Sequence, residues 1–213
     1  MRIVFFGSGN FAVLSLKALI KSRHEILCVL TQPDRKQGRH FKLGFTPVKA
    51  AALFAGLKVF QPVNVNAASS LEFLKKLCAD LFVVVAYGQL LSDELLGLPA
   101  LMPINLHASQ LPRYRGAAPI NWAIINGDKK TGVSIMYMVA KMDAGPLIAQ
   151  REVKIEDQDT AVTLEEKLGI CGAGLLTETL ESIQKRDYRL VEQDEDKAVY
   201  APKLKKETGW IDW

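Results

Sequence analysis

Short apolar runs alternate with helical patterns through the first half of the chain, and this rhythm constrains the fold most. The apolar runs are rich in β-branched and aromatic residues and cover residues 3–6, 26–30, 59–60 and 81–86. Helical spacing fills the stretches between them, at residues 11–21, 47–54 and 71–77. Such alternation is typical of βαβ units. We therefore predict an α/β fold, a Rossmann-like, open, mostly parallel twisted sheet with helices on both faces.

The second half of the chain has a different pattern. Two β-rich runs at residues 133–138 and 147–155 flank a loop, which indicates a strand, loop, strand unit with an antiparallel pair. One long helix or a broken pair is expected over residues 160–183, and a short strand with a basic tail over residues 197–206. Residues 31–45 are polar, basic and contain glycine, so we expect a loop there.

Composition limits the class of protein. The 213 residues suit one large domain, and 49% hydrophobic with 23% charged residues is ordinary globular composition. Three scattered cysteines and three scattered histidines form no metal-binding pattern, so we expect free buried thiols, a reducing compartment and no metal. The apolar run at the N-terminus is too short for a signal peptide or membrane span, so we expect a cytoplasmic protein with no membrane partner.

Ligands of open α/β sheets bind beyond the carboxyl ends of the strands. The first such segment is GSGNFA at residues 7–12, which matches a dinucleotide-binding fingerprint. The acidic residue that this fingerprint needs would be Asp34, which lies beyond the expected end of the second strand. A tight strand-to-helix turn that requires glycine explains the segment equally simply, and we favour that interpretation.

The second segment follows the next apolar strand. Residues alternate between faces in a strand, so Asn105 and His107 lie on the same side. A structural histidine bonded to a carbonyl is the simple alternative. The long irregular loop that follows, with Arg113 and Arg115 between prolines, is typical of a binding segment. Asp143, a single acid in an apolar stretch, adds a third polar group.

No serine or cysteine is placed as a nucleophile beside Asn105, His107 and Asp143. The set therefore suits a reaction in which the substrate is the nucleophile, such as an amine attacking an acyl donor. The amide and the imidazole would stabilise the oxyanion, and the carboxylate would orient the imidazole and help move a proton.

These residues resemble those of a known family. INLHASQLPRYRGAAPI at residues 104–120, with Asp143 downstream, is similar to the formyltransferases that use 10-formyltetrahydrofolate. LTQPDR at 30–35, VVAYG at 84–88, YAPKL at 200–204 and IDW at 211–213 resemble more narrowly the branch that acts on initiator methionyl-tRNA.

The resemblance implies a fold, a reaction and a site. It assigns catalysis to Asn105, His107 and Asp143, with 10-formyltetrahydrofolate as formyl donor and no metal. It implies that folate binds to two segments: Ser109, Gln110, Leu111 and Pro112, and Tyr87, Gly88, Gln89, Leu90 and Leu91. Gln110 departs from the family, which usually has leucine there. In this family the glycine turn serves the sheet and its pocket.

The basic segment at residues 31–45 is the expected contact with nucleic acid. Such a run is usually only a solvated loop, but the resemblance implies that it enters the acceptor stem of the initiator tRNA. The implied contacts are Arg35, Lys36, Arg39 and Lys42, of which Arg39 matters most. Phe41 stacks on a base in one interpretation and folds under the loop in the other.

The resemblance also predicts the domain organisation. We expect a catalytic domain over residues 1–200 and the start of a linker over 201–213, without the C-terminal β-barrel that grips tRNA; we expect a monomer. Three rival functions stay open: formylation of an amino sugar nucleotide or glycinamide ribonucleotide, a dinucleotide-dependent oxidoreductase, and a non-catalytic RNA-binding domain.

Overall fold

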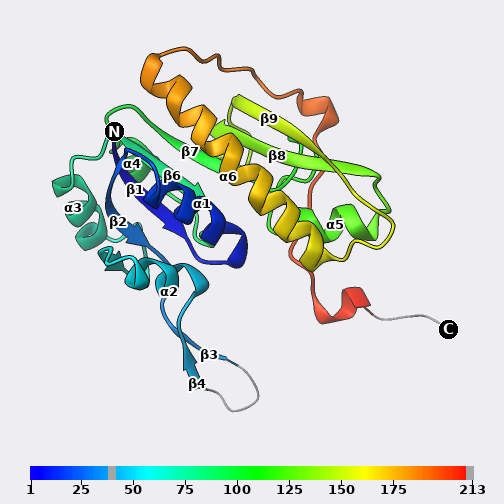
Figure 1. The fold of residues 1–213 in the computed structure, drawn as a ribbon, viewed down its shortest axis with the longest axis horizontal. Coiled ribbons are helices and arrows are strands. Elements are labelled where there is room, and N and C mark those ends of the chain that lie inside the picture. Colours follow the sequence, from blue (N-terminus) through cyan, green and yellow to red (C-terminus); the bar gives the residue numbers. More distant parts are fainter. Residues whose placement is uncertain (38–41, 210–213) are drawn as a thin grey trace.

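The centre of the computed structural model, which describes residues 1–37 and 42–209, is a seven-stranded sheet of order β5-β2-β1-β6-β7-β8-β9 (Figure 1). Its parallel part consists of β5 (Val59–Phe60), β2 (Glu25–Leu30), β1 (Arg2–Gly7), β6 (Leu81–Val85) and β7 (Met102–His107). The most hydrophobic strand, β6, lies in the middle of the sheet. The predicted Rossmann-like α/β fold is confirmed.

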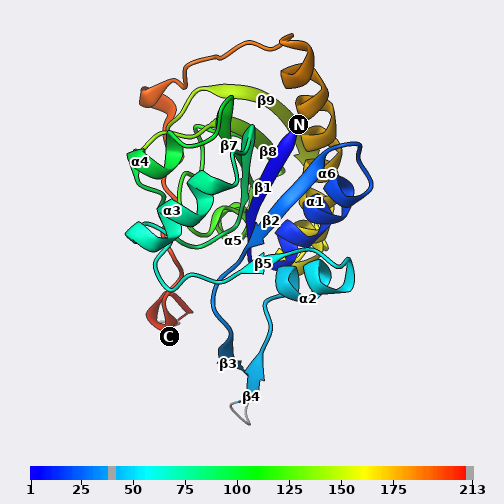
Figure 2. The same cartoon turned by 90° about the vertical axis from the view of Figure 1, so that its left-hand side faces the viewer.

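Helices cover both faces of the parallel part. One face carries α1 (Asn10–Ile20), α2 (Pro47–Phe54) and α6 (Ala161–Lys185), and the other carries α3 (Ala68–Lys76) and α4 (Asp93–Leu96) (Figure 2). Alternate residues of β1 enter the two cores: Ile3 and Phe5 pack with α1, while Val4 and Phe6 pack with α3 and α4. Because both faces are buried, the strands are continuous apolar runs.

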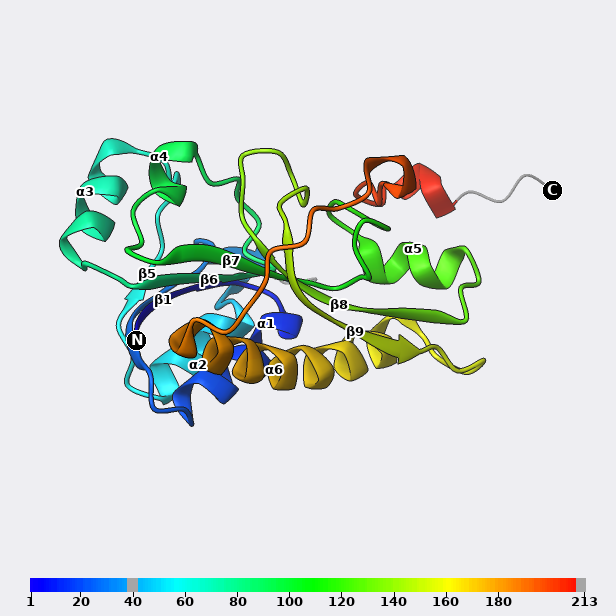
Figure 3. The same ribbon diagram turned by 90° about the horizontal axis from the view of Figure 1, so that it is seen from above.

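The last two strands run against the rest. β8 (Lys130–Tyr137) is antiparallel to β7, and β9 (Leu147–Lys154) is antiparallel to β8. The predicted strand, loop, strand unit is therefore confirmed. Helix α5 (Pro119–Ile125) connects the loop after β7 to β8, and α6 lies along the sheet (Figure 3). β7 is the boundary strand, parallel to β6 on one side and antiparallel to β8 on the other.

Local signals locate the helix starts. The Thr46 hydroxyl accepts a 3.0 Å hydrogen bond from the Lys49 amide, and Pro47 opens α2, as the sequence predicts. Helix α6 is one unbroken helix. Its cap is Thr160, and Thr163 is its reciprocal partner in the capping box.

Two segments differ from the expectations. The basic segment contains two short antiparallel strands, β3 (Arg35–Gln37) and β4 (Lys42–Gly44), which project from the sheet (Figure 2). Arg39 and Phe41 lie outside the described residues. The strand expected over residues 197–206 is reduced to an isolated bridge between Arg115 and Tyr200, flanked by 3-10 turns at Glu195–Lys197 and Lys206–Gly209.

The chain still contacts the domain after residue 200. The Ala201 amide donates to the Arg115 carbonyl at 2.7 Å, and the Trp122 indole donates to the Pro202 carbonyl at 2.8 Å. We call residues 193–202 the closing segment, because they return to the loop that follows β7. Within the described residues, no helix has the length and apolar character to cross a membrane. Cys28 is buried as expected, but Cys78 is exposed and Cys171 intermediate.

Candidate active site

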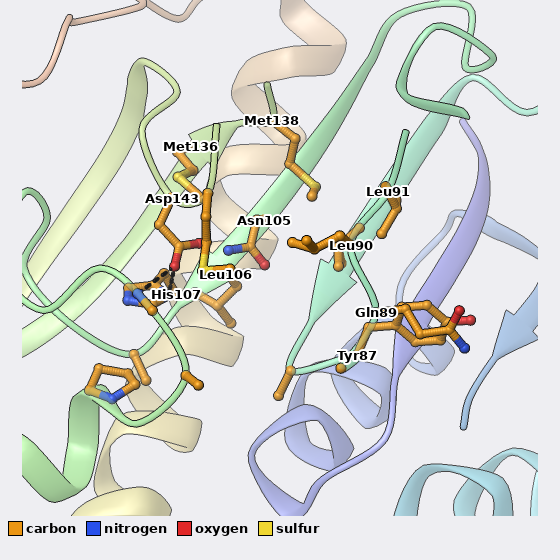
Figure 4. Close-up of a pocket in the computed structure, with 18 of the residues that line it drawn as sticks. Tyr87, Gln89, Leu90, Leu91, Asn105, Leu106, His107, Met136, Met138 and Asp143 are labelled. Atoms are coloured by element: carbon orange, nitrogen blue, oxygen red, sulfur yellow. Dashed lines mark hydrogen bonds and ion pairs between the residues drawn. The ribbon is translucent and has the colours of Figure 1, made fainter. Parts of the chain in front are cut away.

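A cavity of about 460 Å³ opens beyond the carboxyl ends of β6 and β7. Figure 4 shows two facing walls. One, which we call the reactive wall, consists of Asn105, His107 and Asp143. The other, which we call the neutral wall, consists of residues 87–91 after β6. The structure thus brings together the three predicted catalytic residues, which come from β7 and from the loop between β8 and β9.

Asn105 and His107 share one face of β7, as the alternation of strand side chains predicts. Both are largely buried, at 9% and 7% exposure. The pairing of Asn105 with Val84 of β6 and Met136 of β8 sets its position in the sheet. Its amide points into the space between the two walls (Figure 4).

Two acceptors flank the imidazole of His107. Nε2 lies 2.8 Å from the Tyr114 carbonyl oxygen and therefore carries a proton. Nδ1 lies 3.7 Å from Asp143 Oδ2, beyond hydrogen-bond distance. His107 therefore makes the structural hydrogen bond to a carbonyl through Nε2 and also turns Nδ1 toward Asp143. The two arrangements are compatible because they use different ring nitrogens.

Asp143 is held in an uncommon backbone conformation. Its φ is 50°, in the left-handed region that non-glycine residues rarely adopt. Its Oδ2 accepts a 2.8 Å hydrogen bond from the Gly116 amide, which aims the carboxylate at His107. Gly145 closes the loop against β8, where a Cβ would overlap the carbonyl oxygen of Tyr137.

The neutral wall is built from main chain held by uncharged side chains. Gln89 accepts from the Val65 amide at 2.9 Å and donates to the Pro62 carbonyl at 3.2 Å. Ser8 donates to the Tyr87 carbonyl, and Asn66 donates to the Leu90 carbonyl. Gly88 has φ 89°, a conformation that favours glycine at this turn. All five predicted residues of this segment line the cavity.

The other predicted folate segment does not line the cavity. None of Ser109, Gln110, Leu111 and Pro112 is among the described residues that line it. Ser109 is fully buried and donates to the Arg113 carbonyl, while its own carbonyl accepts from Ser134. In this structure the segment supports the end of β7, and its contact with folate stays a prediction.

The glycine turn after β1 serves packing. A Cβ on Gly7 would lie 2.8 Å from the Phe5 ring and 2.9 Å from Ala12. The start of α1, where a dinucleotide phosphate would bind, meets the carboxylate of Glu165, which accepts from the Phe11 amide at 3.2 Å. Lys49 and Gln61 bind Asp34, and the Lys49 contact lowers the pKa of that carboxyl. These contacts favour the turn interpretation.

Several residues of the site carry no local signal in the sequence. Arg115, which lies in the loop expected to be a binding segment, is fully buried and contacts Gln193 and Glu195 of the closing segment. Glu195 and Arg115 form a pair that lowers the Glu195 pKa to about 2, with Lys141 contributing next. Met136 and Met138 complete the apolar lining. Only the tertiary structure places these side chains at the site.

Three of the four predicted contacts with nucleic acid lie on β3 and β4. Arg35, Lys36 and Lys42 belong to these strands, and Arg39 lies outside the described residues. The segment follows the carboxyl end of β2. Because β2, β6 and β7 are parallel, it leaves the sheet at the same ends of the strands where the cavity opens. Among the described residues, no group of three or more histidine, cysteine or acidic side chains is arranged to hold a metal ion.

Comparison with known proteins agrees with this geometry. A protein named methionyl-tRNA formyltransferase, from Caldanaerobacter subterraneus subsp. tengcongensis, is 48% identical over 214 residues, which cover 100% of this chain and 69% of that protein. A solved phosphoribosylglycinamide formyltransferase from Bacillus halodurans superposes with a TM-score of 0.73 at 28% identity, covering 87% of this chain and 96% of that one.

A more distant structure bears on the fold alone. An N-formyltransferase from Helicobacter canadensis, solved in complex with folinic acid and dTDP-3-aminofucose, has a TM-score of 0.70 at 20% identity, covering 97% of this chain and 71% of that one. A sequence model described as formyl transferase matches residues 1–180. The reactive wall, the fold and these matches agree, and the chain belongs to the formyl transferase family.

Proposed function

We propose that this chain transfers the formyl group of 10-formyltetrahydrofolate to the α-amine of methionine on initiator methionyl-tRNA. One observation carries the proposal most directly. The described residues that line the cavity include Asn105, His107 and Asp143 but no serine, threonine, cysteine or lysine. A site without a serine, threonine, cysteine or lysine nucleophile suits transfer to a nucleophilic substrate. The 48% identical relative named methionyl-tRNA formyltransferase supports the acceptor.

The geometry supplies each group that such a transfer needs. The amine nitrogen attacks the formyl carbon, and negative charge develops on the formyl oxygen. Asn105 donates a hydrogen bond to that oxygen, and the imidazole of His107 lies beside it as a second stabilising group. The C–N10 bond then breaks, the new amide C–N bond remains, and the proton lost by the amine passes to N10, with Asp143 as the relay.

The neutral wall is the proposed seat of the folate ring. The cavity volume of about 460 Å³ lies within the usual range for small-molecule sites, and its lining is mainly apolar. Main-chain groups of residues 87–91, held by neutral side chains, offer hydrogen bonds to a planar heterocycle. A role for residues 109–112 in folate binding remains part of the proposal; in the structure they support β7.

One assay separates the proposed function from its rivals. The protein is incubated with 10-formyltetrahydrofolate and charged initiator tRNA, and formyl-methionine is followed. Parallel reactions contain an amino sugar nucleotide or glycinamide ribonucleotide, and a separate titration follows NADH fluorescence. We expect formyl-methionine in the reaction that contains charged initiator tRNA, and no formylated product in the parallel reactions. Formylation of a sugar nucleotide without formylation of tRNA would assign another acceptor, and NADH binding without folate binding would favour an oxidoreductase.

The β3–β4 segment is the proposed contact with tRNA phosphates, because it contains basic residues and leaves the sheet at the carboxyl end of β2. We predict that Arg39→Ala weakens the use of tRNA, seen as a higher KM for tRNA, and leaves the dissociation constant for folate unchanged. Removal of a cation that binds phosphate should also reduce the salt dependence of tRNA binding. An equal loss of folate binding would count against a tRNA role for this segment.

We also propose that the chain acts as a monomer in the cytoplasm. The proposed substrates, a folate and an aminoacyl-tRNA, support that location. This chain spans 69% of the length of the relative from Caldanaerobacter, which therefore extends beyond the matched region. Residues 1–200 are the proposed catalytic domain, and light scattering across protein concentrations tests the monomer.

A further inference from the structure

Gln193 lies outside the region that the family model matches, yet it reaches the reactive wall. The match covers residues 1–180, and Gln193 begins the closing segment. Its side chain is 8% exposed, so its amide must find hydrogen-bond partners within the protein. The partners that it finds connect the loop after β7 to the loop that carries Asp143.

The amide nitrogen of Gln193 holds the backbone of the Asp143 loop. It donates to the Asp143 carbonyl at 3.0 Å and to the Gly145 carbonyl at 2.7 Å. Both carbonyls belong to the loop in which Asp143 adopts a φ of 50°, a value unfavourable for a side chain other than glycine. Two bonds from one rigid amide therefore stabilise a conformation that the loop would otherwise adopt less often.

The amide oxygen of Gln193 is fixed by Arg115. It accepts from Arg115 Nε at 3.1 Å and from Nη2 at 2.8 Å. Arg115 is fully buried and also binds both carboxylate oxygens of Glu195, at 2.8 Å and 3.1 Å. Because the guanidinium can only donate, it forces the oxygen of Gln193 toward itself and the nitrogen toward the Asp143 loop.

The same short network also reaches the carboxylate. Gly116, the residue after Arg115, donates its amide to Asp143 Oδ2 at 2.8 Å. Asp143 is therefore held at its side chain by Gly116 and at its backbone by Gln193, and both supports are anchored at Arg115. The carboxylate oxygen that Gly116 holds, Asp143 Oδ2, lies 3.7 Å from His107 Nδ1.

We propose that Gln193 is a positioning residue for the transfer reaction, acting through Asp143 by fixing the left-handed backbone of its loop. The proposal rests on the catalytic role proposed for Asp143. It assigns to the closing segment a part in the active site: the segment completes the reactive wall.

Two variants separate this role from simple structural support. Gln193→Glu keeps the oxygen acceptors for Arg115 but turns a carboxylate without a proton toward two carbonyl oxygens. Gln193→Met keeps the approximate volume and removes both the donor and the acceptor. We expect both to lower kcat on the order of 10- to 100-fold, because a small displacement of a catalytic group has a large effect on turnover. The KM values for both substrates should change little.

Matched controls use an exposed glutamine near the end of α6. Gln184→Glu and Gln184→Met make the same chemical changes away from the cavity and should leave kcat, KM and thermal unfolding unchanged. If Gln193→Met unfolds at a much lower temperature, Gln193→Glu decides, since it preserves the anchor on Arg115. Turnover of Gln193→Glu equal to that of the unsubstituted protein would overturn the proposal.

A second readout does not need activity. The chain has three histidines, so the imidazole nitrogens can be resolved by nitrogen NMR and His107 identified with His107→Gln. Displacement of the Asp143 carboxylate should shift the Nδ1 resonance of His107 in both Gln193 variants and in neither control. An unmoved resonance would overturn the positioning role. Absence of tRNA formylation by the unsubstituted protein would overturn the proposed function instead, and the NMR comparison would still test Gln193.

Discussion

The two walls of the cavity are built by different physical means. On the reactive wall, Asp143 connects through Gln193 to an ionic group, in which Arg115 and Lys141 bind Glu195. On the neutral wall, uncharged groups hold the chain, chiefly Gln89. The difference fits the division of work that we propose, in which one wall fixes the atoms that react and the other shapes a surface for a flat ligand.

The two walls also differ in the number of chain segments that build them. The neutral wall is a single segment directly after β6, supported by the neighbouring segment at residues 62–66. The reactive wall draws on β7, on the loop after β8 and on the closing segment. We therefore expect changes on the reactive wall to lower turnover and changes on the neutral wall to weaken binding of the formyl donor.

The largest expected effect is the loss of a reacting group. Asn105→Ala and His107→Ala should each reduce kcat on the order of 100-fold or more, because each removes stabilisation of the developing oxyanion. Folding should persist, as measured by circular dichroism and thermal unfolding. Near-normal turnover in either variant would remove that residue from the mechanism.

A backbone change should have the next largest effect. Gly145→Ala places a methyl group against the Tyr137 carbonyl, so the loop must move and carry Asp143 with it. We expect turnover to fall on the order of 10- to 100-fold, as for other small displacements of catalytic groups. Gly127→Ala is the control, since Gly127 has φ 65° but open space around it. Equal losses in both variants would indicate general strain in place of a displaced loop.

On the neutral wall we expect an effect on binding. Gln89→Leu removes the bonds to the Val65 amide and the Pro62 carbonyl with little change in volume. The KM for the formyl donor should rise about fivefold or more, since one hydrogen bond contributes ~1 kcal/mol. Steady-state kinetics at saturating tRNA measures this. A fall in kcat without a change in KM would mean that both walls act on the chemistry.

The smallest expected effect is a pH dependence of stability that belongs to the reactive wall and not to the neutral wall. Arg115, then Lys141, lower the Glu195 pKa from 4.5 to about 2. The contribution of the Glu195 ion pairs to the stability of the fold is therefore fully present above about pH 4.5 and is lost as pH falls toward 2. Because Glu195 is half exposed, solvent screens the pair and the effect should be small. Thermal unfolding at low salt should show that Glu195→Gln is slightly less stable at neutral pH and that the difference disappears in this window. A constant difference down to pH 2 would contradict the ionic anchor.

Much of the parallel half could be predicted from local patterns. Apolar runs marked the strands, and Thr46 with Pro47 marked the start of α2. The position of Asn105 and His107 on one face of β7 followed from the alternation of side chains along a strand. These features depend on neighbours a few residues apart, so a short stretch of sequence contains the whole cause.

Segments whose structure depends on distant parts of the chain were less predictable. Residues 197–206 were expected to form a strand, but they form one bridge and several bonds to the loop after β7. The two strands inside the basic segment were expected as loop, because short strands are stabilised by their pairing partners. Arg115 was expected in a binding segment, and nothing near it in the sequence reveals its contacts with Gln193 and Glu195.

The sequence by itself determined the α/β class, the position of the cavity at the strand ends and the three reactive residue types. Only the tertiary structure decided that Arg115 is internal, that residues 109–112 do not line the cavity, and that Gln193 reaches Asp143. The physical reason is the range of the interactions. Strand and helix patterns act between near neighbours, whereas Gln193 and Asp143 are 50 residues apart and meet only when the sheet has formed.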